Sequence, residues 1–343
     1  MATVDRRNGD RGVQIGGLCS MFDKTNRHCS RGILAMASPF DVIPDVVIDY
    51  VRSVFGAANE KVSRAMSAHP SMHEESLDHI LVMELTAAPP AFFAAEQVGV
   101  SLESHWLGGR WMHGRWEIAD IAIFVLLRRR GNLVARKVAL LQTKRLYSKE
   151  IPVAPIDESD YRIGIGRLAD RTDRLVPIST QRVFGFDLSS AYQATGAGHR
   201  QIDHIDEYFE LRGIPVYYGF YNPLTLPFQT TYPILDGRLP ESGNDVGCRI
   251  VPADHVHAVM RGLTEGRSPS VSDIEAGSPF DPIDSTSTLG WRLERFVADE
   301  VLKCRQGRLF EDTTDQNLRA LLYERSAPIS TAITITIDVG GDA

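Results

Sequence analysis

The chain has 343 residues, of which 43% are hydrophobic and 24% are charged, and its net charge is −7. This composition is typical of a soluble globular protein with one large domain or two modest ones. No apolar run approaches the ~20 residues that a membrane span needs, and the polar N-terminus has no apolar signal region, so we expect a cytoplasmic protein without membrane association. The four cysteines are scattered and form no C-x-x-C pair, which indicates reduced thiols rather than a zinc site.

The first part of the chain, residues 1–70, is predicted to be an irregular and helical segment. Residues 1–35 are rich in Gly, Asn, Arg and Ser, which favours an irregular lead. Apolar residues at spacings of three and four then predict an amphipathic helix over residues 42–55. Residues 59–66 either extend this helix or form a second short one.

A helix with several acidic residues is predicted for residues 71–88. Ser71 and Glu74 have the spacing of a capping box, and two prolines follow the helix. Glu74 and Glu75 suit a helix N-terminus because of the helix dipole. Glu84 lies within the apolar stripe, where an unpaired carboxylate is costly, so we expect it to pair with a base or to reach a metal.

Two apolar runs, residues 118–127 and 133–141, are joined by a short basic turn and predict a β-hairpin. Gly131 and Asn132 tolerate the positive φ that such a turn needs. Neither run alternates cleanly between apolar and polar residues. Both faces of the hairpin are therefore expected to be covered, which favours a central position in a sheet.

Polar residues lie where these two strands begin and end. A turn centred at Gly131 pairs Asp120 with Gln142, give or take one residue, and Lys144 follows two residues later on the same face. A carboxylate and a carboxamide oxygen suit Mg²⁺. The Lys144 ammonium can orient a water molecule or stabilise charge on a phosphate.

Asp120 and the run Gln142-Thr143-Lys144 resemble the Asp and the (D/E)-X-K parts of the PD-(D/E)XK nuclease superfamily. Gln142 stands where the usual pattern has Asp or Glu, and it resembles the Q-X-K variant found in restriction and phage-defence nucleases. The resemblance covers roughly residues 74–147. It implies an α/β fold with a restriction-endonuclease-like core, in which helices flank a central mixed β-sheet.

The resemblance also implies a further acidic group from a helix that precedes the core strands, for which Glu75 is the first choice and Glu84 the rival. We predict a nuclease core at residues 71–225 and a C-terminal α/β extension, residues 226–343, packed on it. A strand at 182–188, a helix at 199–211 ending at Gly213 and a strand at 214–221 complete the core. In the extension, the patterns predict strands at 247–252 and 331–339 and helices at 253–263, 291–304 and 315–323. His255 and His257 are interpreted as helix-surface residues.

Positive charge is concentrated in residues 101–200, although the whole chain is acidic. Such clustering is typical of a groove that follows a phosphate backbone. Arginines 128–130 are equally well explained as a solvated hairpin tip. The predicted nucleic-acid-binding residues are Arg145, Arg162, Arg167, Arg171 and Arg174.

The combined prediction is a metal-dependent endonuclease that hydrolyses phosphodiester bonds of DNA. Asp120, Gln142 and Glu75 would hold Mg²⁺ or Mn²⁺, and Lys144 would position the attacking water. By analogy with Q-X-K nucleases, the resemblance suggests bacterial defence against phage, with a partner protein supplying recognition. The sequence is compatible with a homo-oligomer and does not decide the oligomeric state. The alternatives are a non-catalytic nucleic-acid-binding or sensing protein on the same fold, and an enzyme acting on RNA or nucleotides.

Overall fold

The computed structural model describes residues 38–107, 118–151, 182–193, 196–232, 245–276, 289–310, 312, 314–323 and 329–340. All the helices and strands named below belong to one unit, Pro39–Ala343. Among these residues, no helix is both long enough and apolar enough to cross a membrane.

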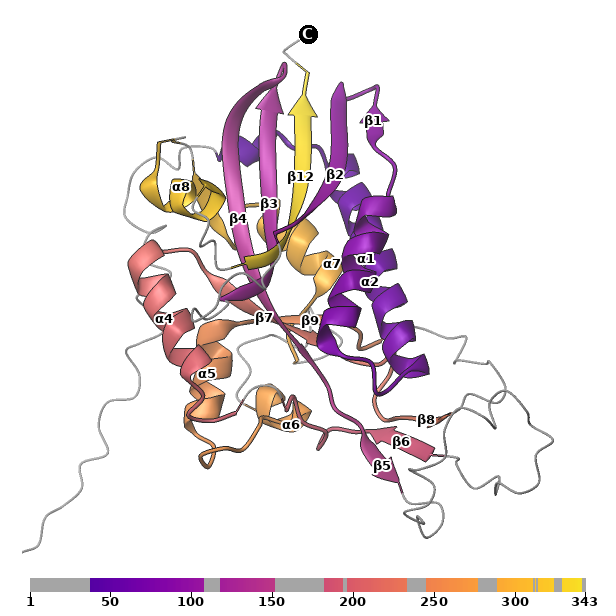
Figure 1. The fold of residues 1–343 in the computed structure, drawn as a ribbon. Helices are drawn as coiled ribbons and strands as arrows, with labels where there is room; N and C mark the ends of the chain where they lie inside the picture. The colour runs from indigo at the N-terminus through magenta and orange to yellow at the C-terminus, as the bar shows by residue number, and fades with distance from the viewer. Residues whose placement is uncertain are drawn as a thin grey trace, which may run out of the picture. The chain divides into compact units, whose positions relative to one another are not determined.

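A central mixed sheet of nine described strands organises the fold (Figure 1). Eight strands follow one another across it in the order β1 (Ala91–Phe93), β2 (Val98–Trp106), β12 (Ile329–Val339), β3 (Ala119–Arg129), β4 (Asn132–Arg145), β7 (Val216–Tyr221), β9 (Arg249–Pro252) and β10 (Trp291–Arg292). The ninth, β11 (Arg308–Phe310), pairs with β4. The pairs β12·β3 and β4·β7 are parallel and the others are antiparallel. The class predicted from the sequence, α/β with a central mixed sheet flanked by helices, is confirmed at this level.

The β3–β4 hairpin has the predicted register. Ile121 faces Leu141, and the pairing continues to a bulge near the turn. In this turn, the two residues with positive φ are Arg130 (51°) and Gly131 (77°), so the turn lies one residue earlier than predicted. A two-residue hairpin turn of this kind needs positive φ at both central positions, and the strands therefore extend to Arg129 and Asn132.

Strand β12 lies between β2 and β3 (Figure 1), which makes the last part of the chain integral to the central sheet. Its predicted span, residues 331–339, agrees closely with the observed strand. Its position in the sheet could not be predicted from the sequence, because the apolar alternation of a strand does not indicate which strands pair with it. Four strands of the predicted extension, β9, β10, β11 and β12, thus share one sheet with strands of the predicted core.

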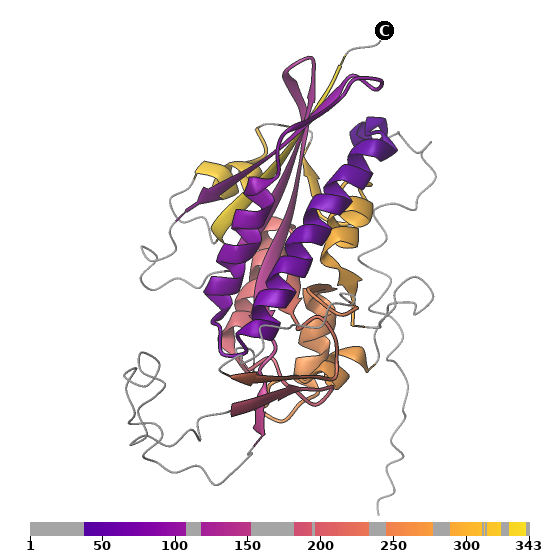
Figure 2. The same cartoon turned by 90° about the vertical axis from the view of Figure 1, so that its right-hand side faces the viewer.

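Helices cover both faces of this sheet (Figures 1 and 2). Helices α1 (Asp45–Ala68) and α2 (Glu74–Ala87) lie over one face, and α4 (Arg200–Arg212) and α5 (Ala253–Arg261) lie over the other. α1 is one continuous helix across the two stretches predicted at 42–55 and 59–66. α4 ends at Gly213 with φ of 62°, as its sequence predicts.

The remaining elements are short. They are η1 (Pro39–Val42), α6 (Val271–Glu275), α7 (Leu293–Arg295), the π-helical turn η4 (Phe296–Val301) and α8 (Gln316–Tyr323). β10, α7 and η4 replace the single helix predicted at 291–304. β5 (Lys149–Ile151), β6 (Arg182–Phe186) and β8 (Phe228–Tyr232) form a separate three-stranded sheet, so the strand predicted at 182–188 does not join the main one.

His255 and His257 are buried, which corrects their interpretation as surface residues. His257 Nδ1 lies 2.7 Å from Asp206 Oδ1 in α4, and His257 Nε2 lies 3.0 Å from Tyr218 Oη in β7. His255 Nε2 lies 3.0 Å from the carbonyl oxygen of Ile274. The alternation with valine did not indicate that these histidines are buried, because the polar partners of both rings come from distant parts of the chain. Burial lowers the pKa of His257, and the Asp206 carboxylate opposes this effect.

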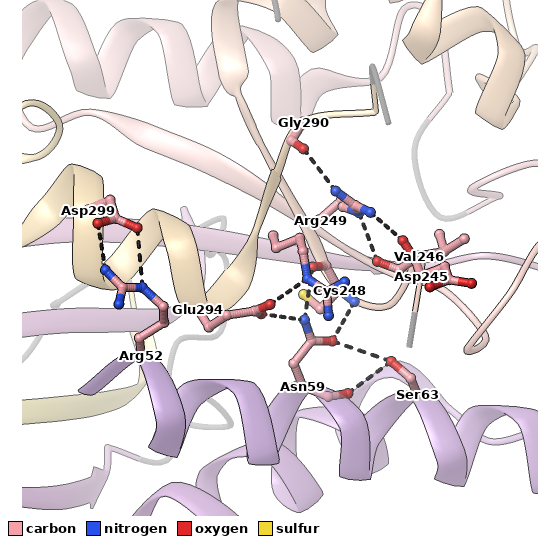
Figure 3. A network of polar contacts seen from close by, with 11 residues as sticks. Arg52, Asn59, Ser63, Asp245, Val246, Cys248, Arg249, Gly290, Glu294 and Asp299 are labelled. Atoms are coloured by element: carbon pink, nitrogen blue, oxygen red, sulfur yellow. Dashed lines mark hydrogen bonds and ion pairs between the residues drawn. The ribbon is translucent and has the colours of Figure 1, made fainter. Parts of the chain in front are cut away.

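A second buried polar network joins α1 to β9 and α7 (Figure 3). Asn59 donates to Glu294 Oε2 at 2.8 Å and accepts from the amide of Cys248 at 2.7 Å. Arg249 is fully buried and donates to the carbonyl oxygens of Asp245, Val246 and Gly290. Every polar group has a partner, as buried polar groups require.

We predict that Asn59→Ala lowers the free energy of unfolding by about 2–3 kcal/mol, because Glu294 Oε2 and the buried amide of Cys248 each lose the bond to Asn59, although Glu294 Oε1 keeps Arg292. Arg64→Ala, which removes an exposed ion pair with Glu60 on the same helix, is the matched control and should cost at most about 0.5 kcal/mol. Urea unfolding of both variants measures the difference. Equal losses would show that the Asn59 network contributes no more than a surface pair.

Candidate functional site

Three elements meet at one end of the β3–β4 hairpin: the first turns of α2, the start of β3 and the end of β4. Asp120 is the second residue of β3, and Gln142, Thr143 and Lys144 lie near the end of β4. The hairpin register places Asp120 beside Gln142, and α2 packs against β2 and β4. The polar residues therefore gather where the apolar part of the sheet ends.

Asp120 is held by three contacts to one of its oxygens. Its Oδ2 accepts from Gln142 Nε2 at 2.5 Å and from the Thr143 amide at 2.6 Å, and it lies 3.0 Å from Thr143 Oγ1. Among the described residues, no hydrogen bond reaches its Oδ1. Burial raises the pKa of Asp120, while the Lys144 charge and the bonds from Thr143 oppose this rise. The carboxylate is thus fixed in orientation and keeps one oxygen available.

Gln142 contributes an unsatisfied oxygen. Its side chain is buried, and its amide nitrogen is used by Asp120. Within the part of the chain that the structure describes, its Oε1 has no hydrogen-bond partner. A buried acceptor left in this way costs about 1–3 kcal/mol, so a donor or a cation at this position would stabilise the site.

Lys144 is 4% exposed and is tied to α2. Its Nζ lies 3.0 Å from Glu74 Oε1 and donates to the Thr143 carbonyl at 2.6 Å. Glu74 Oε2 also accepts from the amide of Arg145 at 3.1 Å. Burial raises the pKa of Glu74, and the Lys144 charge opposes this effect. The predicted capping box is wrong, since His73 is the N-cap and the Glu74 side chain instead bonds to the end of β4.

Asp78 belongs to this cluster and was missed in the sequence. Its Oδ1 accepts from Tyr221 Oη at 2.7 Å, and its Oδ2 lies 3.0 Å from Thr143 Oγ1. Burial, followed by the negative charge of Asp120, raises its pKa well above the ordinary value. The available signal was its position four residues after Glu74, because residues at this spacing share one face of a helix.

Glu75 and Glu84, the predicted helix acids, lie apart from these contacts. Glu75 is exposed at the first turn of α2, and its charge contributes to the raised pKa of Asp120. Glu84 lies about 15 Å further along the helix than Glu74, from the usual rise per residue. Among the described residues, neither one forms a hydrogen bond with Asp120, Gln142 or Lys144. Glu74 and Asp78 are the α2 carboxylates that reach β4.

Arg145 is turned inward, although it was expected to contact a phosphate. It is 5% exposed and donates to the carbonyl oxygens of Pro70, at 2.7 Å, and Met72. Its guanidinium also stacks on the Tyr147 ring, 4.2 Å from the centroid. It therefore fastens the α1–α2 connection to β4. The other predicted nucleic-acid contacts, Arg162, Arg167, Arg171 and Arg174, lie outside the described residues.

The donor set at Asp120 and Gln142 fits a hard divalent cation. Among the described residues, Gln142 Oε1 has no hydrogen-bond partner and no hydrogen bond reaches Asp120 Oδ1. Both are oxygen ligands of the kind that Mg²⁺ prefers. Within the described ranges, no three His, Cys, Asp or Glu side chains form a group that could hold a metal ion. Two protein ligands completed by water are nevertheless a usual arrangement for Mg²⁺.

No protein-family model, curated protein or solved structure matches this chain. Its function is therefore inferred from the site itself. The site combines a fixed carboxylate, an unsatisfied carboxamide oxygen and a buried ammonium.

The raised carboxyl pKa values predict that stability falls as pH rises. For Asp78, the folded pKa lies above the unfolded one, so the folded state binds more protons between the two values and loses stability as pH increases through them. Urea unfolding in EDTA from about pH 5 to about pH 9 should show this fall when the wild type is compared with Asp78→Asn, because the comparison cancels the opposite contribution of His257, whose pKa is lowered. Asp78→Asn should reduce it by about 1.4 kcal/mol for each unit of pKa difference removed.

The exposed α1 variant Asp45→Asn is the control and should keep the pH profile of the wild type. Identical profiles for Asp78→Asn and the wild type would contradict a raised Asp78 pKa.

Proposed function

We propose that this protein is a metal-dependent endonuclease that hydrolyses phosphodiester bonds of DNA. The observation that carries the proposal is the convergence of Asp120, Gln142 and Lys144, with the Gln142 oxygen buried and without a donor. This arrangement supports the resemblance of these residues to the Q-X-K form of the PD-(D/E)XK superfamily. The central mixed sheet flanked by helices is compatible with a restriction-endonuclease-like core.

Asp120 and Gln142 would hold Mg²⁺ or Mn²⁺, with Glu75 near enough to contribute its charge or a water-mediated contact. A bound cation would offset charge on the phosphate and make water a better nucleophile at neutral pH. Asp120 is suited to this role because three contacts fix one oxygen and leave the other available. Together with Glu74 and Asp78, it gives the site more carboxyl groups than Lys144 alone can balance.

Lys144 would position the attacking water and stabilise negative charge that develops on the phosphate. Two neighbours, Glu74 and the Thr143 carbonyl, fix its ammonium group. An ammonium has three donors, so one remains for water or for a phosphate oxygen. Glu74 thus acts as the residue that orients Lys144.

DNA is the proposed substrate because the resembling families mostly cut DNA. A hydrolase of this kind fits a cytoplasmic role in defence against phage, with a partner protein that supplies recognition. Arg128 and Arg129 are exposed at the opposite end of β3 from Asp120, about 26 Å along the strand from the usual rise per residue, and so do not line the site. A homo-oligomer is compatible with the proposal.

The second candidate is a binding or sensing protein on the same fold. The observation that favours it is the commitment of both basic residues at the end of β4. Lys144 is paired with Glu74, and the Arg145 guanidinium is buried. In that case the cluster would hold α2 against the sheet and would perform no hydrolysis. The protein would then cleave neither DNA nor RNA nor nucleotides.

Plasmid cleavage tests the proposal. Purified full-length protein should nick supercoiled DNA with Mg²⁺ or Mn²⁺ and lose this activity in EDTA. Lys144→Ala and Asp120→Ala should each lower the rate by about 10²–10⁴-fold, the usual contribution of a positioned acid–base group. Lys149→Ala, an exposed lysine nearby in sequence that pairs with Asp187, is the matched control and should cut at the wild-type rate.

Cleavage that survives both site substitutions would refute the assigned site. If no version cuts, single-stranded RNA and nucleoside triphosphates serve as further substrates. Metal binding by the wild type, compared with Asp120→Ala by calorimetry, then separates a silent nuclease from a protein that binds no metal.

A further inference from the structure

A chain of four polar side chains crosses the site from β7 to β3. Tyr221 Oη donates to Asp78 Oδ1 at 2.7 Å. Thr143 Oγ1 lies 3.0 Å from Asp78 Oδ2 and 3.0 Å from Asp120 Oδ2. Asp78 and Thr143 are almost fully buried, so water is not the principal partner of these groups.

The number of protons in this series of side chains indicates how many of its carboxyl groups are ionised. The Thr143 hydroxyl has one proton, yet two carboxyl oxygens lie within hydrogen-bond distance of its oxygen. If both carboxyl groups were ionised, one of these contacts would bring two acceptors together without a proton. One additional proton on a carboxyl group satisfies both contacts, because the hydroxyl can then accept from one side and donate to the other.

The surroundings indicate which carboxyl group carries that proton. Asp120 Oδ2 accepts two N–H bonds and lies near the Lys144 charge, and both features favour the ionised form. Asp78 accepts one bond, from the neutral Tyr221 hydroxyl. The charged groups that act on Asp78 are Asp120 and Glu74, and both oppose its ionisation. Burial opposes it further.

We propose that Asp78 stays protonated and donates to Thr143 Oγ1, so that the Thr143 hydroxyl donates to Asp120 and holds it with its free oxygen available to a cation. Asp78 is then a positioning residue, acting through Thr143 and not as a ligand. We call the hydrogen-bonded series Asp78–Thr143–Asp120 the relay. The role of this relay in cation binding rests on the proposed function, whereas the protonation of Asp78 does not. The relay also gives the middle residue of Gln142-Thr143-Lys144 a specific task that requires a hydroxyl group.

The substitution Asp78→Asn tests the proton directly. A carboxamide can accept from Tyr221 with its oxygen and donate to Thr143 with its nitrogen, so it reproduces the protonated acid. The infrared difference spectrum between the wild type and Asp78→Asn, in EDTA near neutral pH, should contain the C=O band of one protonated carboxyl group. A carboxylate band in its place would overturn the proposal.

Cation affinity, measured by Mn²⁺ titration calorimetry on the full chain, tests the positioning. Asp78→Asn and Thr143→Ser keep the relay and should bind Mn²⁺ within about threefold of the wild type. Asp78→Ala and Thr143→Val break it and should bind about tenfold or more weakly, the size of a hydrogen bond to a charged group. Thermal unfolding of all four variants confirms that each is folded.

Different results would contradict the proposed function and the proposed relay. If the wild type neither binds Mn²⁺ nor cuts DNA, the proposed function fails, and the infrared spectrum still decides the protonation of Asp78. If the wild type binds Mn²⁺ but Asp78→Asn weakens binding as much as Asp78→Ala does, Asp78 acts through its negative charge and the relay is wrong.

Discussion

The hydrogen-bonded register between β3 and β4 determines where each polar group of the candidate site lies. It brings Asp120 beside Gln142, and one oxygen of Asp120 then accepts from both the side chain of Gln142 and the backbone of Thr143. A shift of one residue would turn every side chain of one strand to the opposite face. The apolar residues between the turn and the site, buried on both faces, prevent such a shift.

Helix α2 adds the second constraint. Glu74 and Asp78 lie one helical turn apart and meet successive residues of β4, with Glu74 on Lys144 and Asp78 on Thr143. Each contact compensates part of the cost of burying a charged or polar group. Three carboxyl groups share one nearby ammonium, and their pKa values are accordingly raised. The proposed proton on Asp78 and the proposed cation at Asp120 would each reduce this excess of negative charge.

Local sequence patterns predicted the hairpin, its register and the convergence of Asp120 with Gln142, because facing residues are equally distant from the turn. They also predicted α4 with its Gly213 cap and the final strand. They did not predict that β12 inserts between β2 and β3, since no local signal identifies a distant partner. Asp78 was missed for a related reason, because packing determines which face of a helix lies against a sheet. His257 was misassigned for the same reason, since Asp206 and Tyr218 approach it from other elements.

Two buried polar clusters in this protein differ in a way that bears on function. In the Asn59–Arg249 network, each buried side-chain nitrogen and oxygen has a partner, and its evident role is to fasten α1 to β9 and α7 (Figure 3). At the end of β4, Gln142 Oε1 and Arg145 Nε have no partner among the described residues. A cluster needed only for packing gains nothing from such atoms, and apolar side chains of similar size would often be as stable or more so. Among the described residues, Arg136 Nη1, elsewhere on β4, is also without a partner, so a missing partner alone does not mark a site. What distinguishes Gln142 Oε1 is its place beside a fixed carboxylate, and the proposed cation site rests on this pairing.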